Sequence, residues 1–258
     1  HVATGRFNAV AISANGEYIA AGSDNERVYL FNKDSSTPVW SYLSGGDGVK
    51  SIAISANGEY IAAGSDDDKV YVFDKDSSTP LWSYDTESYI VRSVSISADG
   101  EYIVAGDYDG KAYLFDKDSS TPLWSYSTGG STGVYKVSIS ADGEYIAVGS
   151  DGMKGYLFDK DSSTPLWIFA PEGAVWSAIS ADGKYIVFGC EDNKVYAFKN
   201  SLVDRPSIIP YGPRSGSEPD EPVTLRWFAG SDDRSNLTFD VYLGTNSSSL
   251  SKVADDIS

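Results

Sequence analysis

Along the first 200 residues, short runs of alternating apolar and polar residues are separated by turn-forming residues. In residues 49–84, VKSIAIS is followed by ANG, EYIAAGS by DDD, KVYVFD by KDSST, and PLWSY closes the segment. A two-residue period with many β-branched and aromatic residues predicts four β-strands, the last starting at Pro80. Gly58 supplies the positive φ that the first turn needs. No stretch shows helical spacing, so we expect an all-β fold.

This four-strand pattern recurs five times at a nearly constant interval. The serine before the first turn recurs at steps of 42, 42, 43 and 40 residues, at Ser13, Ser55, Ser97, Ser140 and Ser180. A tryptophan keeps the same pace at Trp40, Trp82, Trp124 and Trp167. A period of about 40–45 residues is typical of one propeller blade, and radial stacking lets each sheet cover its neighbours. We therefore predict a β-propeller with five visible four-stranded blades.

The repeat resembles two propeller families over residues 7–200. SADGEYIAAGS followed by VYLFD looks like a WD-repeat, in which Phe-Asp stands for Trp-Asp at Phe73-Asp74, Phe115-Asp116 and Phe158-Asp159. The ending VYLFDKDSSTPLWSY is similar to the repeat of pyrroloquinoline-quinone-type propellers, whose strand-end Trp docks between blades. The Gly-His dipeptide of WD-repeats and the adjacent cysteine pair of quinone enzymes are missing. Neither the WD hydrogen-bond network nor the quinone chemistry is therefore carried over.

The pattern changes after residue 200, where the fifth repeat ends without a T-P-x-W segment. Five of the ten prolines fall between 206 and 222, which indicates a linker. VTLRWFAG and LTFDVYLGT then resemble the start of a fibronectin type III or immunoglobulin-like domain, with Trp227 as its core Trp. We predict a propeller over 1–203, then a Pro-rich linker and a partial β-sandwich-like segment over 204–258. We expect the chain to continue past Ser258, and both a closed five-blade ring and a larger parent propeller stay open.

Charge and composition exclude several classes of function. The formal net charge of −17 repels nucleic acid and anionic lipid, and no apolar run is long enough to insert in a membrane. Cys190 is the only cysteine and His1 the only histidine, so neither a thiolate metal cage nor an internal Ser-His-Asp triad can form. No first strand contains Asp or Glu, which disfavours a propeller glycosidase. We expect no enzyme activity, no cofactor and no metal.

Two repeated features have competing interpretations. The Tyr and Phe of each third strand could stack on a ligand, but blade packing explains their recurrence better. The Asp-Lys-Asp loops, such as Asp74 to Asp76, and the Asp107-Tyr-Asp109-Gly110 segment could hold a weak cation. Hard cations need several convergent oxygen ligands, so we favour turn capping by the carboxylates.

Variation between repeats is concentrated in two sets of loops. The loops from strand 4 to the next strand 1 and the loops from strand 2 to strand 3 differ, whereas SADGE and DKDSST barely change. In a propeller the two variable sets share one face, and loops on a rigid scaffold commonly carry binding. Counting back five from each repeat serine gives residues expected at the channel mouth: Asn8, Lys50, Arg92, Tyr135 and Val175. Counting back four gives Ala9, Ser51, Ser93, Lys136 and Trp176.

We predict a ligand site at this mouth, formed by Lys50, Arg92, Tyr135, Lys136 and Trp176. Three cations in an acidic protein would attract an anionic group or a sugar, the lysine pKa values would be raised, and the two rings would be free to stack. The alternative is an ordinary rim over which long cations extend. The favoured function is a secreted or cell-surface module that binds protein or glycan. A quinoprotein-like or glycosidase enzyme completed by missing blades, and a structural surface-layer spacer, are the alternatives.

Overall fold

The computed structural model describes residues 5–46, 48–87, 90–129, 133–203, 239–243 and 251–257, and within these ranges the chain forms strands and turns but no helix. By contacts the chain divides into two compact units, His1–Asn200 and Ser201–Ser258. In the second unit, β20 (Phe239–Leu243) pairs antiparallel with β21 (Ser251–Ile257). The predicted linker and Trp227 lie outside the described residues. The domain boundary at 203/204 and the fibronectin-like assignment therefore stay predictions.

The first unit consists of five antiparallel sheets, here called blades 1 to 5, which confirms the predicted all-β propeller architecture. Blade 1 contains β1 (Phe7–Ile12), β2 (Tyr18–Ser23), β3 (Arg27–Asn32) and β4 (Trp40–Leu43). Blade 2 contains β5 (Val49–Ile54), β6 (Tyr60–Ser65), β7 (Lys69–Asp74) and β8 (Trp82–Asp85). Blade 3 contains β9 (Val91–Ile96), β10 (Tyr102–Asp107), β11 (Lys111–Asp116) and β12 (Trp124–Ser127). Blade 4 contains β13 (Val134–Ile139), β14 (Tyr145–Ser150), β15 (Lys154–Asp159) and β16 (Trp167–Phe169).

Blade 5 has only three strands among the described residues: β17 (Val175–Ile179), β18 (Tyr185–Cys190) and β19 (Val195–Lys199). The described part of blade 5 thus contains no fourth strand, in agreement with the absence of a T-P-x-W segment after residue 200. In blade 2 the fourth strand begins at Trp82, so the expectation that Pro80 starts it is wrong by two residues. Leu81 still donates its N–H to the carbonyl O of Val72, which leads the chain into the strand.

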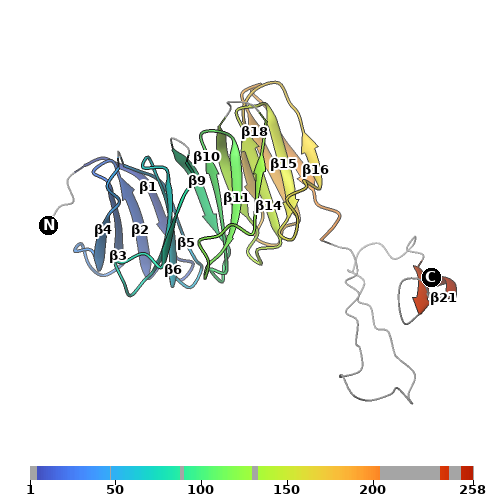
Figure 1. Ribbon diagram of the computed structural model, residues 1–258, viewed down its shortest axis with the longest axis horizontal. Coiled ribbons are helices and arrows are strands. Elements are labelled where there is room, and N and C mark those ends of the chain that lie inside the picture. Colours follow the sequence, from blue (N-terminus) through green and yellow to red (C-terminus); the bar gives the residue numbers. More distant parts are fainter. Residues whose placement is uncertain are drawn as a thin grey trace, which may run out of the picture. The chain divides into compact units, whose positions relative to one another are not determined.

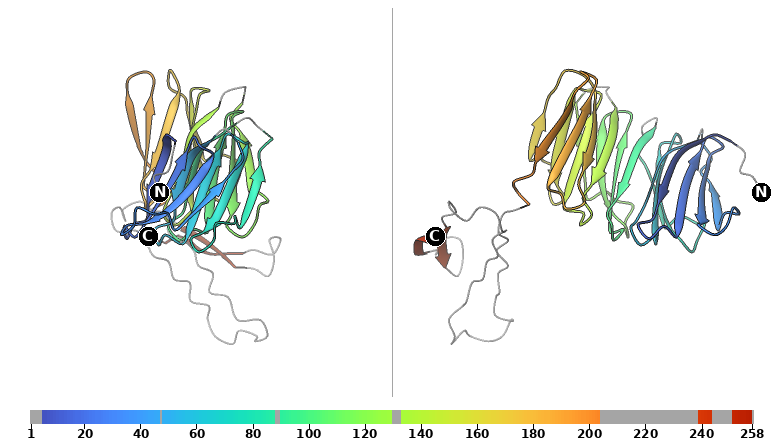
Figure 2. Two further views of the ribbon diagram at one scale, coloured as in Figure 1. Left: turned by 90° about the vertical axis from the view of Figure 1, so that its left-hand side faces the viewer. Right: turned by 180° about the vertical axis from the view of Figure 1, so that it is seen from behind.

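The blades follow one another in chain order, and strands run from first to last across each sheet (Figure 1). The first strand of each blade packs against the first strand of the next, from β1 through β5, β9 and β13 to β17. Blades 1 and 5 are the two ends of this row, as the views from the side and from behind also show (Figure 2). The described residues therefore do not form the closed five-blade ring that the sequence left open.

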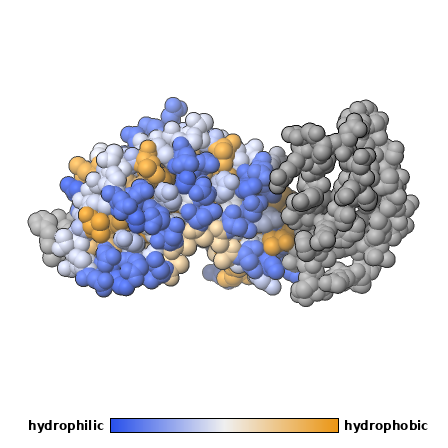
Figure 3. Space-filling model, turned by 90° about the horizontal axis from the view of Figure 1, so that it is seen from below, coloured by the Kyte–Doolittle hydropathy of each residue, from blue (hydrophilic) through white to orange (hydrophobic). Residues whose placement is uncertain are grey.

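The hydrophobic core lies between the blades. Tyr71 and Phe73 of blade 2 are buried against Leu30 of blade 1, together with the partly buried Trp40 and Tyr42. Equivalent clusters fill the other three junctions. In blades 2 to 5 the repeated Tyr and Phe side chains are thus inter-blade packing groups, which confirms the favoured interpretation for these blades. Seen from below, the exposed surface of the first unit is mostly hydrophilic with scattered apolar residues (Figure 3).

Hydrogen bonds reinforce each junction. The indole Nε1 groups of Trp40, Trp82 and Trp124 donate to the carbonyl O atoms of Lys75, Lys117 and Lys160 in the next blade. At the inner strands, the Oγ atoms of Ser51 and Ser93 accept from the backbone N–H groups of Val94 and Val137. These bonds satisfy buried polar groups and fix how each blade meets its neighbour.

Candidate functional site

The two variable loop sets lie at the same end of the blades. In each blade the turn between strands 2 and 3 donates a backbone N–H to the segment before strand 1: Tyr108 bonds to the carbonyl O of Ile90, and Asp151 bonds to that of Gly133. The end of strand 4 joins the same turn, since the N–H of Thr86 donates to the carbonyl O of Asp68. These bonds place variable loops next to the beginning of each first strand, as the sequence predicted.

A β-bulge occurs near the start of the first strand in blades 1 to 4. The pairing register skips one residue in each, and the skipped residues are Asn8, Lys50, Arg92 and Tyr135. A bulge leaves its extra residue out of the ladder and re-aims its side chain. The positions found by counting along the sequence are therefore bulge positions, where the residue lies outside the strand ladder. Its side chain can still bond to the next blade, since the Nδ2 group of Asn8 donates to the carbonyl O of Val49 at 3.2 Å.

Blade 5 lacks the bulge, and this corrects one prediction. Strand β17 pairs with β18 without a register shift and is one residue shorter than the other first strands. Val175 is consequently fully buried at the position of Val134 in blade 4, and it does not line the mouth. Trp176 follows it and is 43% exposed.

Four side chains from neighbouring blades form a continuous stack that we call the arginine–aromatic ridge: Arg92, Tyr108, Tyr135 and Trp176. The guanidinium carbon of Arg92 lies 4.4 Å from the ring centroid of Tyr108 and 4.9 Å from that of Tyr135. The rings of Tyr135 and Trp176 stack with centroids 5.0 Å apart and an interplanar angle of 1°. Distances below about 6 Å are within the range of attractive cation–π contacts. Tyr108 is 43% exposed, so both ends of the ridge reach solvent.

The ridge differs from the predicted site in two respects. Tyr135 is contacted by Arg92 of blade 3 and by Trp176 of blade 5, so its ring is not free to stack on a ligand as expected. Tyr108 is an additional member that counting along the repeats does not reach, since its segment, Asp107-Tyr-Asp109-Gly110, indicated only a possible weak cation site. The sequence does distinguish Tyr108 in one way: it is the only aromatic residue in the turns between strands 2 and 3.

The two lysines of the predicted site do not join the ridge contacts. Lys50 forms an ion pair with Asp66 of its own blade, with Nζ 2.6 Å from Oδ2. Lys136 is an exposed residue, yet the atoms packed around its ammonium group desolvate it and lower its pKa. The expectation that the acidic surroundings would raise the lysine pKa is therefore wrong for Lys136. The grouping of the three cations at the mouth stays a prediction.

Acidic residues in the turns serve the fold. The buried carboxylate of Asp107 accepts hydrogen bonds from the N–H of Lys111 at 2.8 Å and the hydroxyl of Tyr113 at 3.0 Å. The pKa of the Asp107 carboxyl group is raised, mainly because the group is buried. In the Asp-Lys-Asp loops, Asp74 Oδ1 accepts from the N–H of Asp76 at 2.8 Å, and the other loops repeat this cap. Within the described ranges, no three acidic, His or Cys side chains cluster as metal ligands.

These features define the class of protein: a β-propeller whose blades are locked by a strand-end Trp, as in pyrroloquinoline-quinone-type repeats. The pattern of the family described as "Outer membrane protein assembly factor BamB" matches residues 3–201, and the chain belongs to this family. Of the two resemblances seen in the sequence, this match supports the quinone-type repeat. A comparison with curated proteins found no match. In the described part of the chain, no helix has the length and apolarity to cross a membrane.

Proposed function

We propose that the chain is a non-catalytic scaffold that binds a protein partner through the arginine–aromatic ridge and the variable loops around it. The observation that carries this proposal is the composition of the ridge. Trp, Tyr and Arg are the residues most enriched among interface hot spots, and here they gather from three blades on the variable-loop end of the sheets. Blades 1 and 2 place Asn8 and Lys50 at the corresponding positions.

The ridge is also organised before any partner arrives. Arg92 is held between two tyrosines and Tyr135 is held by Trp176, so little side-chain freedom remains to be lost on binding. Ordered anchors bind more tightly because association costs less conformational entropy. The exposed parts of Tyr108 and Trp176 would provide the buried contacts of such an interface.

The family description supports a location and a kind of partner. Its members are described as outer membrane protein assembly factors, which supports a role in the cell envelope and a protein as the bound species. Within the envelope, we propose the extracellular or cell-surface location that is expected from the sequence. A glycan is the second candidate, since the exposed rings of Tyr108 and Trp176 could each stack on one sugar.

Site-specific photocrosslinking tests the proposal. A photoreactive phenylalanine analogue is placed at Trp176, with Leu123 as control, because Leu123 is exposed before a fourth strand and outside the ridge. In envelope extracts of the source organism, we expect a protein adduct from position 176 only. The partner identified is then titrated against the wild type and against Trp176→Ala/Arg92→Ala, and loss of hot-spot anchors worth about 2 kcal/mol each predicts at least a 30-fold weaker affinity. Equal adducts at both positions, or an unchanged affinity, would reject the ridge as the binding surface. An adduct whose added mass is removed completely by glycosidases, and which yields no partner peptides in mass spectrometry, would favour the glycan.

A further inference from the structure

The loop between strands 3 and 4 has the same sequence, Lys-Asp-Ser-Ser-Thr-Pro, in blades 1 to 4. All four copies lie within the described ranges, at residues 33–38, 75–80, 117–122 and 160–165. Buried positions of the adjoining third strand vary more, since Val70 of blade 2 is replaced by Ala112 in blade 3 and by Gly155 in blade 4. The exposed loop is thus more uniform than the core beside it, and packing between blades does not account for this uniformity.

Hydrogen bonds within the loop use some of its polar groups but not all of them. In blade 2 the Oγ of Ser77 accepts from the backbone N–H of Thr79 at 3.0 Å, and it donates to the carbonyl O of the same residue. The first serine of each other loop also accepts from the N–H of the threonine. Together with the Asp74 cap, these bonds fix the backbone of the turn, so the first serine has a structural role.

The second serine and the threonine of each loop carry free hydroxyl groups. Ser78 and Thr79 are exposed, and in the part of the chain that the structure describes their hydroxyls make no hydrogen bond. The same is true of the other pairs, Ser36 with Thr37, Ser120 with Thr121 and Ser163 with Thr164. The proline that follows favours an extended backbone at the threonine. Each loop therefore presents two adjacent hydroxyls to solvent from an ordered turn.

An exposed aliphatic side chain follows each hydroxyl pair in the sequence. It comes directly after the proline and is between 39% and 53% exposed, at Val39, Leu81, Leu123 and Leu166. Blades 2 to 4 each have a blade on both sides, so this exposure does not depend on the ends of the row. A sugar has hydroxyls and an apolar C–H face, so a sugar attached to the pair would lie within reach of the aliphatic group and remove part of it from water.

We propose that these four loops are sites of O-glycosylation, in which a neutral sugar is attached to a hydroxyl of the Ser-Thr pair. Exposed Ser and Thr next to Pro are the composition typical of O-glycosylated segments. In the transfer, the hydroxyl oxygen forms a bond to the anomeric carbon of a sugar carried on a phosphate. The bond between that carbon and the phosphate oxygen breaks, and the hydroxyl proton passes to a base of the glycosyltransferase.

A phosphate group is the other modification that a free hydroxyl accepts, and the charge of the loop disfavours it. Phosphate would add negative charge beside the exposed Asp76, in a chain whose net charge is already −17. A neutral sugar brings no such repulsion. The observations therefore favour a sugar over a phosphate.

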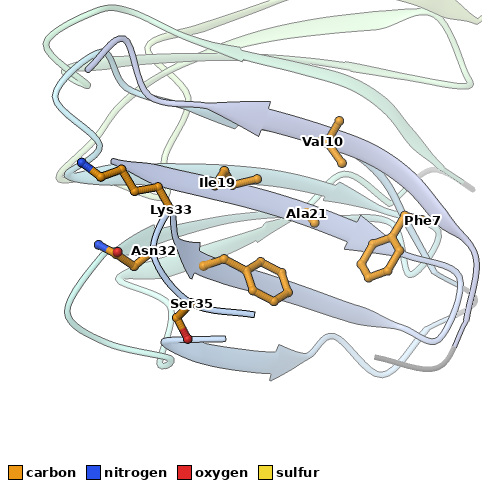
Figure 4. Close-up of a pocket in the computed structure, with 8 residues that line it drawn as sticks. Phe7, Val10, Ile19, Ala21, Asn32, Lys33 and Ser35 are labelled. Carbon is orange, nitrogen blue, oxygen red and sulfur yellow. The ribbon is translucent and has the colours of Figure 1, made fainter. Parts of the chain in front are cut away.

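The glycosylated loops lie at the end of the blades that is opposite to the variable loops. In an antiparallel blade, the loop after strand 3 and the turn before it are at opposite ends of the sheet. Figure 4 shows both ends of blade 1, with Phe7 where β1 begins and with Asn32, Lys33 and Ser35 at the far end, where β3 passes into the loop. Sugars on these loops would leave the arginine–aromatic ridge open to a partner.

Peptide mass spectrometry of the protein isolated from its source organism tests the proposal. Cleavage after lysine and arginine places each loop at the start of its own peptide, at residues 34–50, 76–92, 118–136 and 161–184. We expect each peptide to be heavier than its sequence by at least one sugar residue. Fragmentation that keeps the sugar on its side chain should locate it on the Ser-Thr pair.

Two variants expressed in the source organism make the test specific. Ser78→Ala/Thr79→Val should remove the sugar from peptide 76–92 and leave the other three peptides unchanged. Ser83→Ala is the matched control, because Ser83 is exposed in β8 of the same peptide but lies outside the loop, and it should keep the sugar. Melting temperatures confirm that both variants are folded. Peptides with unmodified masses, phosphate in place of sugar, or sugar on Ser83 instead of the pair would each overturn the proposal.

Discussion

The indole Nε1 of Trp82 donates a hydrogen bond to the carbonyl O of Lys117, 2.6 Å away, although the two residues are 35 positions apart and belong to neighbouring blades. The same ring lies 5.2 Å from the ring of Phe115, centroid to centroid. One side chain therefore provides both the apolar contact and the polar contact across the junction. Because the repeat places an equivalent Trp in blades 1, 3 and 4, the junctions are rebuilt from one sequence element.

Replacing Trp82 separates these two contributions. Trp82→Ala should lower the free energy of unfolding by about 3 kcal/mol, the lower end for large-to-small changes, since the ring is only partly buried. Trp82→Phe keeps apolar contact but leaves the Lys117 carbonyl without its donor, which should cost about 1–2 kcal/mol. Urea titration of both variants provides the values. A change within about 0.5 kcal/mol for the alanine variant would mean that the indole is dispensable for the junction and free to serve a ligand.

The turns between strands 2 and 3 predict a stabilising substitution. Their fourth residue has a left-handed backbone, with φ of 59° at Met153, 68° at Asp68 and 84° at Gly110. Met153 is exposed, so Met153→Gly removes backbone strain without losing packing and should stabilise by about 0.5–1 kcal/mol after the entropy cost of glycine. Gly110→Ala is the matched reverse change and should destabilise by about 1 kcal/mol. Thermal melts that move both variants in the same direction would contradict this account.

The buried carboxylate of Asp107 predicts a pH dependence with a definite sign. Burial raises its pKa above the unfolded value of about 4, so the folded state binds the proton more readily. Ionisation therefore costs stability near neutral pH, and that stability returns as the pH falls through the folded pKa toward 4. The unfolding free energy of the wild type minus that of Asp107→Asn should increase from pH 7 to about pH 4. A difference that falls over this range would show that the bonds from Lys111 and Tyr113 outweigh burial.

The ridge predicts a measurable coupling between Arg92 and Tyr135. In a double-mutant cycle with Arg92→Gln and Tyr135→Leu, the coupling free energy should be about 0.5–1 kcal/mol in favour of the native pair. Unfolding titrations of the four proteins provide it. The pair Lys50 and Tyr135 offers a control. No contact joins these two residues, so their coupling free energy should be zero. Equal coupling in the two cycles would contradict a specific stack.

The fold could be predicted because the same four-strand pattern recurs five times along the sequence. The site could be predicted only in part. Counting from the repeat serines located Arg92 and Tyr135, since the bulge adds one residue at a constant distance in four blades. It failed at Val175 because blade 5 lost that residue, and a missing residue in a five-residue strand has no signature of its own. The pairing of Lys50 with Asp66, and the place of Tyr108 beside Arg92, depend on how turns fold back beside strands, which a strand pattern does not encode.

The bulge in the first strands of blades 1 to 4 allows one residue to vary without changing the strand pairing that holds the blade together. Every other inner position of a blade is constrained by its neighbour, so a change there risks the assembly of the whole row. The bulge residue lies outside the strand ladder, and its identity changes from Asn8 to Lys50, Arg92 and Tyr135 through successive blades. When a blade-encoding segment is duplicated, each new copy that keeps the bulge has one partly exposed position outside the strand ladder. Selection can then assemble a recognition surface one repeat at a time while the architecture is inherited unchanged.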